Sequence, residues 1–121
     1  MIKSALIIGL GGGLGSMLRY LSSLLALKYL GGWFPWATWG VNVLGCLLAG
    51  VLLGLSGSAT NPTVRLLWLV GFCGGFTTFS AFALENINWW QMKEYYKITF
   101  YTLASIGGGF AAVWLGASTV K

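Results

Sequence analysis

The chain has 121 residues, of which 57% are hydrophobic and only 7% are charged, and its formal net charge is +5. A soluble domain carries about 25% charged residues because its surface faces water, so the composition excludes an ordinary water-soluble globule. The basic residues are scattered instead of clustered, which argues against a nucleic-acid-binding protein.

Long uncharged stretches predict four membrane-spanning helices that form one domain, residues 1–121. Charged residues are absent from 29–64, 66–84 and 98–120, and a bilayer core needs about 20 helical residues to cross it. Strands of a membrane barrel would alternate over about ten residues, a pattern this chain lacks, so we expect an all-α integral membrane protein. The expected spans are 4–29, 36–55, 66–86 and 98–118, joined by connections at 31–35, 56–63 and 88–97.

Tryptophans gather near the ends of these spans, where aromatic side chains anchor membrane proteins at the interface. We therefore interpret them as interfacial anchors: Trp33, Trp36, Trp39, Trp68, Trp89, Trp90 and Trp114. Cys46 and Cys73 fall inside spans and are expected to be small apolar fillers instead of a disulfide or metal pair.

The distribution of basic residues does not predict which way the chain is oriented in the membrane. An even number of spans would put Lys3, Arg65 and Lys121 on one side, and Lys28, Lys93 and Lys97 on the other. Three against three gives no bias under the positive-inside rule. Either the chain inserts both ways, which permits an antiparallel homodimer, or it has one weakly biased topology.

Glycines recur at a spacing of four residues within the spans. Such pairs let helix backbones approach closely in lipid, but they do not say whether the contact is within or between chains. The pairs are Gly9 and Gly13, Gly11 and Gly15, Gly50 and Gly54, and Gly71 and Gly75.

Arg19 and Asn42 are the polar residues inside the first two spans that most need an explanation. An arginine at a helix centre costs roughly 2.5–3.5 kcal/mol on insertion scales, so Arg19 must snorkel toward the Lys28 end, face a polar vestibule or cap carbonyls of a neighbouring helix. Asn42 follows Thr38 by one turn, and its amide donors would be unsatisfied against lipid. It is either part of a site or half of an interhelical hydrogen bond.

The third span contains poor helix-forming residues in its middle. Gly74 and Gly75 precede Thr77 and Thr78, and glycine and β-branched residues both disfavour helix. We therefore predict a break in the middle of the membrane, with freed carbonyls that something else, often a cation, must satisfy.

Aromatic residues follow this break. Phe79 and Phe82 share a helix face with Ser80 beside them. These rings either pack the core or offer their positive edges to an anion path.

Three elements of the sequence, GGGLGSMLRY, WGVNVLG and GFCGGFTTFSAF, closely resemble the Fluc (CrcB-type) fluoride channels. The likeness covers essentially the whole chain. It implies a fluoride-selective channel for passive export across the bacterial plasma membrane, built as an antiparallel dual-topology homodimer with two pores along the subunit interface. It also implies a central structural sodium ion held by the backbone carbonyls of Gly74 and Thr77.

The same resemblance assigns roles to individual residues. Asn42 corresponds to the pore asparagine, Phe79 and Phe82 to the pore phenylalanines, and Arg19 and Glu85 to the residues of the vestibule. The hydroxyls expected to complete the fluoride path are those of Thr38, Ser80, Tyr101 and Ser105. Three alanines depart from the family pattern, Ala37 for a common glycine, and Ala81 and Ala83 for hydroxyl residues. We expect these to alter conductance without abolishing function.

Two rival interpretations remain open at this point. A multidrug-type proton-coupled transporter would also have four helices and dual topology, but it needs a titratable carboxylate in the membrane, and the first, second and fourth spans have none. A non-conducting helper subunit would leave the polar third span unexplained. An enzyme is not expected, because the chain has no histidine, no aspartate and no credible acid–base pair.

Overall fold

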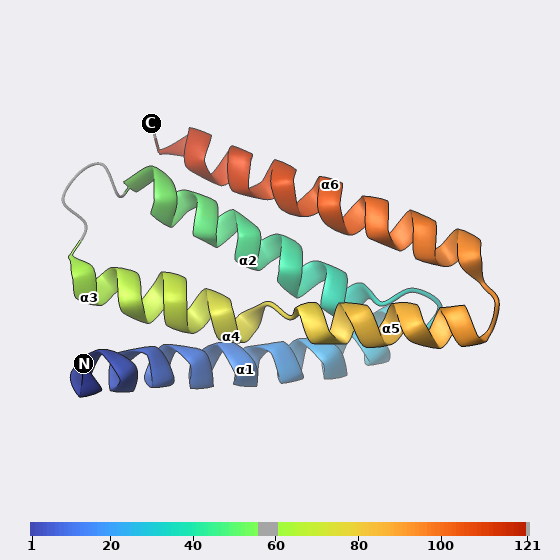
Figure 1. Cartoon of the computed structure of the whole chain (residues 1–121), viewed down its shortest axis with the longest axis horizontal. Coiled ribbons are helices and arrows are strands. Elements are labelled where there is room, and N and C mark those ends of the chain that lie inside the picture. Colours follow the sequence, from blue (N-terminus) through green and yellow to red (C-terminus); the bar gives the residue numbers. More distant parts are fainter. Residues whose placement is uncertain (56–60, 121) are drawn as a thin grey trace.

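The computed structural model describes residues 1–55 and 61–120, and these residues form helices joined by short connections (Figure 1). Four runs, Ile2–Leu30, Trp36–Leu55, Pro62–Gln91 and Tyr95–Thr119, are long and apolar enough to cross a membrane. The prediction of an all-helical chain is confirmed, and its four long apolar runs are consistent with four membrane spans. The elements are α1 (Ile2–Leu30), α2 (Trp36–Leu55), α3 (Pro62–Val64), η1 (Arg65–Cys73, with π-helical turns), α4 (Gly74–Phe76), α5 (Phe79–Gln91) and α6 (Tyr95–Thr119).

The second span has the predicted bounds, whereas the other three are longer than predicted. The sequence prediction ended each span where its apolar residues end, but helical hydrogen bonding continues into the polar flanks. The connection predicted at 88–97 is therefore corrected to the short turn 92–94. There the amide of Glu94 donates to the Trp89 carbonyl at 2.9 Å, and Lys93 has a φ of 59°. Part of the predicted 56–63 connection, 56–60, lies outside the described residues.

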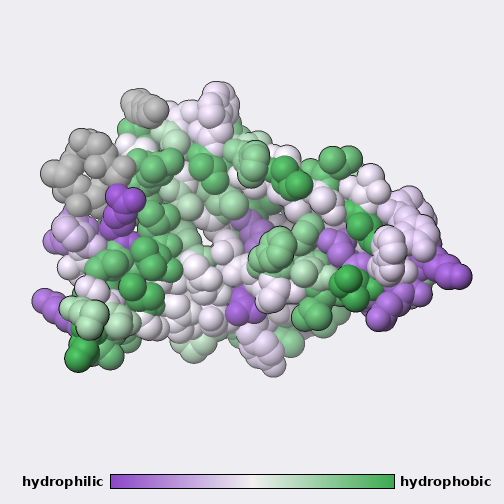
Figure 2. Space-filling view, viewed as in Figure 1, coloured by the Kyte–Doolittle hydropathy of each residue, from purple (hydrophilic) through white to green (hydrophobic). Residues whose placement is uncertain are grey.

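The helices run lengthwise through the molecule as two closely packed pairs (Figure 1). α1 packs along η1 and α4, and α2 packs along α6. The N-terminus, the start of α3 and the end of α6 lie at one end of the molecule. Apolar residues cover much of the surface between the two ends, and hydrophilic residues gather mainly at the ends (Figure 2). This distribution suits a molecule whose middle is surrounded by lipid.

Glycines set the closest helix contacts. A Cβ on Gly15 would overlap the backbone of Phe72 and Phe76, and one on Gly75 would overlap the backbone of Gly12. Gly50 meets the backbone of α6 in the same way. By contrast, a Cβ on Gly9 or Gly13 would meet nothing within 4 Å. Three of the four predicted pairs, those at 11/15, 50/54 and 71/75, therefore pack within the chain, and the Gly9/Gly13 pair faces outward.

Several aromatic residues form an internal cluster around Tyr101. Tyr101 is fully buried, and its ring centroid lies 4.9 Å from that of Phe82 and 5.5 Å from that of Trp89. The Trp39 indole N–H donates to the Ala104 carbonyl on α6 at 3.1 Å. Trp39 thus joins α2 to α6, and its role as an interfacial anchor stays a prediction.

The glycine contacts generate the first testable prediction. Gly15→Ala should lower the thermal unfolding midpoint of the purified protein, because overpacking against fixed backbone costs about 1–3 kcal/mol. Gly13→Ala is the matched control on the same helix and should leave the midpoint unchanged or raise it, since alanine is the better helix former. Equal midpoints for the two variants would contradict the packing described for α1 and η1.

Candidate functional site

The third span is interrupted at Thr77 and Thr78. Thr77 has φ −85° and ψ 156°, and Thr78 has φ −150° and ψ 115°, so both are extended between α4 and α5. The Thr78 hydroxyl then caps α5 by accepting from the Ala81 amide at 3.1 Å, as threonines at helix N-termini commonly do. The position of this interruption within a bilayer stays a prediction.

Asn42 on α2 holds the extended segment with two hydrogen bonds. Its Nδ2 donates to the Thr78 carbonyl at 3.1 Å, and its Oδ1 accepts from the Thr78 amide at 2.7 Å. The side-chain amide therefore pairs with the backbone of Thr78 as a neighbouring peptide group would. This is the interhelical hydrogen bond that the sequence left as one alternative, and it uses only one of the two Nδ2 protons.

The interruption redirects amides that would otherwise pair along the helix. In a continuous helix each amide donates to the carbonyl four residues earlier, so the amides of Thr78 and Ala81 would bond to the carbonyls of Gly74 and Thr77. Here they donate to Asn42 Oδ1 and Thr78 Oγ1 instead. The carbonyls of Gly74 and Thr77 are thereby released from helical pairing.

Arg19 on α1 also reaches the interruption. Its Nε donates to the Gly75 carbonyl at 3.1 Å, which is the capping role among the three alternatives for this arginine. The side chain also lines a small cavity of about 60 Å³ together with Ser23, Thr38 and Thr78. A guanidinium always remains charged, so this arginine places a positive charge beside the interrupted segment.

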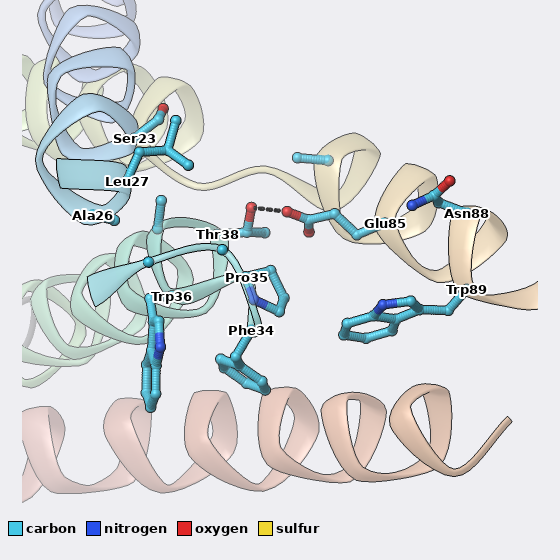
Figure 3. Close-up of a pocket in the computed structure, with 14 residues that line it drawn as sticks. Ser23, Ala26, Leu27, Phe34, Pro35, Trp36, Thr38, Glu85, Asn88 and Trp89 are labelled. Atoms are coloured by element: carbon cyan, nitrogen blue, oxygen red, sulfur yellow. Dashed lines mark hydrogen bonds between the residues drawn. The ribbon is translucent and has the colours of Figure 1, made fainter. Parts of the chain in front are cut away.

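Glu85 lies at the centre of a second polar cluster, which joins three helices. Thr38 Oγ1 donates to Glu85 Oε2 at 2.7 Å, and the Tyr101 hydroxyl donates to Oε1 at 2.8 Å. Figure 3 shows the Thr38 bond beside a cavity of about 440 Å³ whose wall includes Glu85, Asn88 and Trp89. An anion is bound by hydrogen-bond donors. The hydroxyl protons of Thr38 and Tyr101 are donated to the Glu85 carboxylate in this structure and are not directed at the cavity.

A further cavity, of about 410 Å³, brings together four of the residues predicted for the fluoride path. Asn42, Phe79, Phe82 and Ser105 all line it. The two phenylalanine rings have centroids 5.7 Å apart at an interplanar angle of 42°. Ser105 Oγ is buried and has no hydrogen-bond partner among residues 1–55 and 61–120. The other lining residues are Cys46, Thr77, Thr78, Ile106, Gly109, Phe110 and Val113.

The other residues predicted for the site lie either at the interruption or in the Glu85 cluster. Ser80 Oγ lies 3.1 Å from Thr78 Oγ1, at the start of α5. Thr38, Glu85 and Tyr101 form the separate cluster next to the larger cavity. The sequence did not lead us to place Cys46 beside the predicted path, yet this residue lines the same cavity as Asn42. Cys46 follows Asn42 by four residues and therefore lies on the same face of α2, so the spacing could have predicted this position.

Comparison with known proteins identifies relatives along nearly the whole chain. A family model described as CrcB-like protein, Camphor Resistance (CrcB), matches residues 6–117. A fluoride-specific ion channel FluC of Azobacteroides pseudotrichonymphae is 44% identical, covering 96% of this chain and 94% of that protein. Proteins of the same name from Flavobacterium psychrophilum and Rhizobium leguminosarum are 41% and 43% identical, covering 99% and 97% of this chain, and 98% and 95% of their own lengths.

The bond between Asn42 and Thr78 generates the second prediction. Asn42→Ala leaves an amide and a carbonyl without partners, and each unsatisfied buried group costs about 1–3 kcal/mol. We expect faster hydrogen exchange of the Thr78 amide, measured by mass spectrometry on peptides spanning 74–82. Ser80→Ala, which leaves both bonds of Asn42 in place, is the control. Unchanged exchange in Asn42→Ala would show that the segment is held by other contacts.

Proposed function

The chain belongs to the CrcB-like protein family, and from this premise we propose that it is a fluoride-selective channel for passive fluoride export across the bacterial plasma membrane. It acts as an antiparallel dual-topology homodimer with two pores at the subunit interface and a structural sodium ion on the dimer axis. The relatives described above are named as fluoride-specific ion channels. The family is one of ion channels and not of enzymes, as the residue content of the chain led us to expect.

The cavity of about 410 Å³ is the observation that carries this proposal. Fluoride is small and strongly hydrated, so its path must replace hydrogen bonds from water. Two donors on the cavity wall are available for that task, the second Nδ2 proton of Asn42 and the unpartnered hydroxyl of Ser105. The positive ring edges of Phe79 and Phe82 add a weaker attraction.

The charges around the interruption favour an anion without trapping it. Arg19 bonds to the Gly75 carbonyl through its Nε, which fixes the guanidinium beside the interruption, where it contributes positive potential. Glu85 is held by Thr38 and Tyr101, which partly neutralises its negative field. Conduction requires binding strong enough to admit an ion and weak enough to release it, and this balance suits that need.

The released carbonyls of Gly74 and Thr77 fit a sodium ion. Carbonyl oxygens are hard ligands of the kind that coordinate alkali cations in membrane proteins. Gly74 begins α4, just before the extended segment, and Thr77 is the first residue of that segment; the helical amide partners of both carbonyls bond elsewhere. A second copy related by a twofold axis would double the set to four. The sodium would supply a fixed positive charge that ties the two interrupted helices together.

The dual-topology dimer is supported by the even distribution of positive charge. The starts of α1 and α3 lie at one end of the molecule, and the turn between α5 and α6 lies at the other (Figure 1). By sequence, Lys3, Arg65 and Lys121 belong to the first group, and Lys28, Lys93 and Lys97 to the second, three against three. Each orientation in the membrane is then similarly favourable, as an antiparallel assembly requires.

Passive export follows from simple electrostatics. Fluoride crosses membranes as neutral HF in acidic surroundings and ionises inside the cell, where it is trapped. A membrane potential that is negative inside favours loss of the anion by about 2.3 kcal/mol per 100 mV. A channel selective for fluoride therefore relieves fluoride toxicity without coupling to an energy source.

Ion release from liposomes tests the channel. Vesicles with the purified protein should release fluoride rapidly and chloride negligibly, followed by two ion-selective electrodes in parallel. Phe82→Ile removes the ring edges, and Asn42→Asp replaces a donor by a negative charge, so each should slow fluoride release by about tenfold or more. Phe100→Ile, at a residue 64% exposed and outside the cavity, should release fluoride at the unmodified rate.

The outcome that refutes the channel is equally plain. Fluoride release no faster than from empty vesicles, from protein shown to be folded, would exclude it. Cation-coupled transport of the multidrug type would then become the leading explanation.

Sodium removal tests the second part of the proposal. Replacing sodium by N-methyl-D-glucamine at constant ionic strength should lower the unfolding midpoint and the dimer fraction in detergent. A ligand that binds only the folded state stabilises it by about 2.7 kcal/mol at 100 times its Kd. Identical midpoints in the two cations would argue that the Gly74 and Thr77 carbonyls hold no sodium.

A further inference from the structure

We propose that an aromatic cavity beside the start of α6 binds the phosphate group of an anionic membrane phospholipid. The cavity has a volume of about 260 Å³, and its wall comes from the connection between α1 and α2, from α5 and from the first turns of α6. Five of its six lining residues are aromatic, and the sixth is basic. They are Trp33, Phe34, Trp89, Tyr96, Phe100 and Lys97.

The buried core holds two rings of this wall in place. Phe34 is only 8% exposed, and its ring centroid lies 5.5 Å from that of the fully buried Tyr101. The Trp89 centroid also lies 5.5 Å from that of Tyr101, at an interplanar angle of 83°. Because both rings pack against one rigid neighbour, the cavity is formed before a ligand arrives.

The other three rings form an open rim. Trp33, Tyr96 and Phe100 are 69%, 72% and 64% exposed. They lie just beyond or just inside the ends of the apolar runs Ile2–Leu30 and Tyr95–Thr119, the depth at which aromatic side chains meet lipid headgroups. The open side of the cavity therefore faces the headgroup layer of the membrane.

Lys97 brings a positive charge to the wall in a fixed position. Its Nζ lies 5.9 Å from the centre of the Trp89 ring and 2.9 Å from Glu94 Oε2. Glu94 is not part of the cavity wall, and an ammonium has three donors, so donors remain for a ligand. Lys93 in the same turn adds a second positive charge, so that two lysines oppose the one carboxylate between residues 86 and 120.

The aromatic residues of the wall add further donors. The indole N–H groups of Trp33 and Trp89 and the hydroxyl of Tyr96 have no hydrogen-bond partner among residues 1–55 and 61–120. An indole nitrogen only donates, so a ligand rich in acceptor oxygens matches this wall. A quaternary ammonium ligand would also suit aromatic rings, but it would meet the like charge of Lys97.

The apolar part of the wall points to a lipid instead of a free phosphate. A free phosphate would leave the rings of Phe34 and Phe100 without a partner. In a phospholipid, the glycerol and the first carbons of the acyl chains cover these rings while the phosphate reaches Lys97. Basic pockets beside membrane-spanning helices recognise anionic headgroups in this way.

Lipid titration followed by native mass spectrometry tests the charge preference. Purified protein in detergent is titrated with phosphatidylglycerol and, separately, with phosphatidylcholine of the same acyl chains. We expect phosphatidylglycerol to bind about fivefold more tightly, because a lysine near a membrane surface favours an anionic lipid by roughly this factor. Equal affinities for the two lipids would overturn the proposal.

Lysine variants test whether the preference belongs to this cavity. Lys97→Met keeps the length of the side chain and removes the charge, so the preference for phosphatidylglycerol should disappear, whereas Lys97→Arg should retain it. Lys93→Met is the matched control, because it removes the same charge from the same turn at a residue outside the cavity wall. Equal losses in Lys93→Met and Lys97→Met would show a diffuse attraction instead of a site.

A double variant excludes an effect of the carboxylate that Lys97→Met leaves unpaired. Glu94→Gln combined with Lys97→Met has neither charge of the pair, and it should lack the preference as the single variant does. A preference restored in the double variant would mean that Glu94 had repelled the lipid, and that Lys97 does not bind it.

A photoreactive phosphatidylglycerol locates the site in the wild type without any variant. A diazirine near the headgroup should label peptides that contain residues 33–34 and 96–100, and millimolar inorganic phosphate should not reduce this labelling. Labelling only elsewhere in the chain would overturn the site, and competition by inorganic phosphate would identify a free anion as the occupant instead of a lipid. These measurements follow binding and not ion flux, so they decide the lipid site even if vesicles release no fluoride.

Discussion

Backbone polar groups inside an apolar surrounding must find partners within the protein, and the structure is organised around the one place where a long helix cannot supply them. At Thr77 and Thr78 the third span is extended, and an amide or carbonyl left unpaired there would cost several kcal/mol in lipid. Partners come from two other helices, Asn42 on α2 and Arg19 on α1. The carbonyls of Gly74 and Thr77 lose their helical partners, because the amides of Thr78 and Ala81 bond to Asn42 Oδ1 and Thr78 Oγ1 instead. One backbone interruption thus fixes the positions of two polar side chains and creates a potential cation site.

Close helix packing is a consequence of the same requirement. Arg19 can reach the Gly75 carbonyl only because α1 lies almost in backbone contact with η1 and α4, at Gly11, Gly15, Gly71 and Gly75. In lipid no hydrophobic effect drives helices together, so small residues at the contact supply van der Waals packing instead. On the other side, Gly50 and the Trp39 indole bring α2 against α6. The positions of the polar groups thus depend on residues that have no polar side chain at all.

The sequence predicted the architecture better than the details of the site, and the reason is physical. Apolar length determines how many spans a chain can form, so the four helices and the bounds of α2 followed from composition. Helical hydrogen bonds extend beyond the apolar stretch, so the ends of α5 and α6 did not. Periodicity could identify glycine pairs but not their partners, because a face turned to lipid and a face turned to another helix have similar composition in a membrane. The sequence also could not predict which polar groups bond to one another. The bond of Asn42 to Thr78 joins residues 36 positions apart, and that of Tyr101 to Glu85 joins residues 16 positions apart.

The distribution of hydrogen-bond donors suggests how a channel of this kind can bind an anion without holding it. Most donors near the interruption already have protein partners, because Thr38 and Tyr101 bond to Glu85, Arg19 bonds to Gly75, and Thr78 caps α5. These bonds hold the framework rigid, and a donor committed to the framework does not bind the ion. The neutral donors of the cavity wall without a partner among residues 1–55 and 61–120 are one proton of Asn42 and the hydroxyl of Ser105, and Arg19 uses only its Nε on Gly75, so its Nη donors add to them. In the proposed channel, a strongly hydrated anion would lose water only where rigid donors replace it. A larger, less hydrated anion would gain too little from these donors to enter an apolar cavity lined by phenylalanine rings.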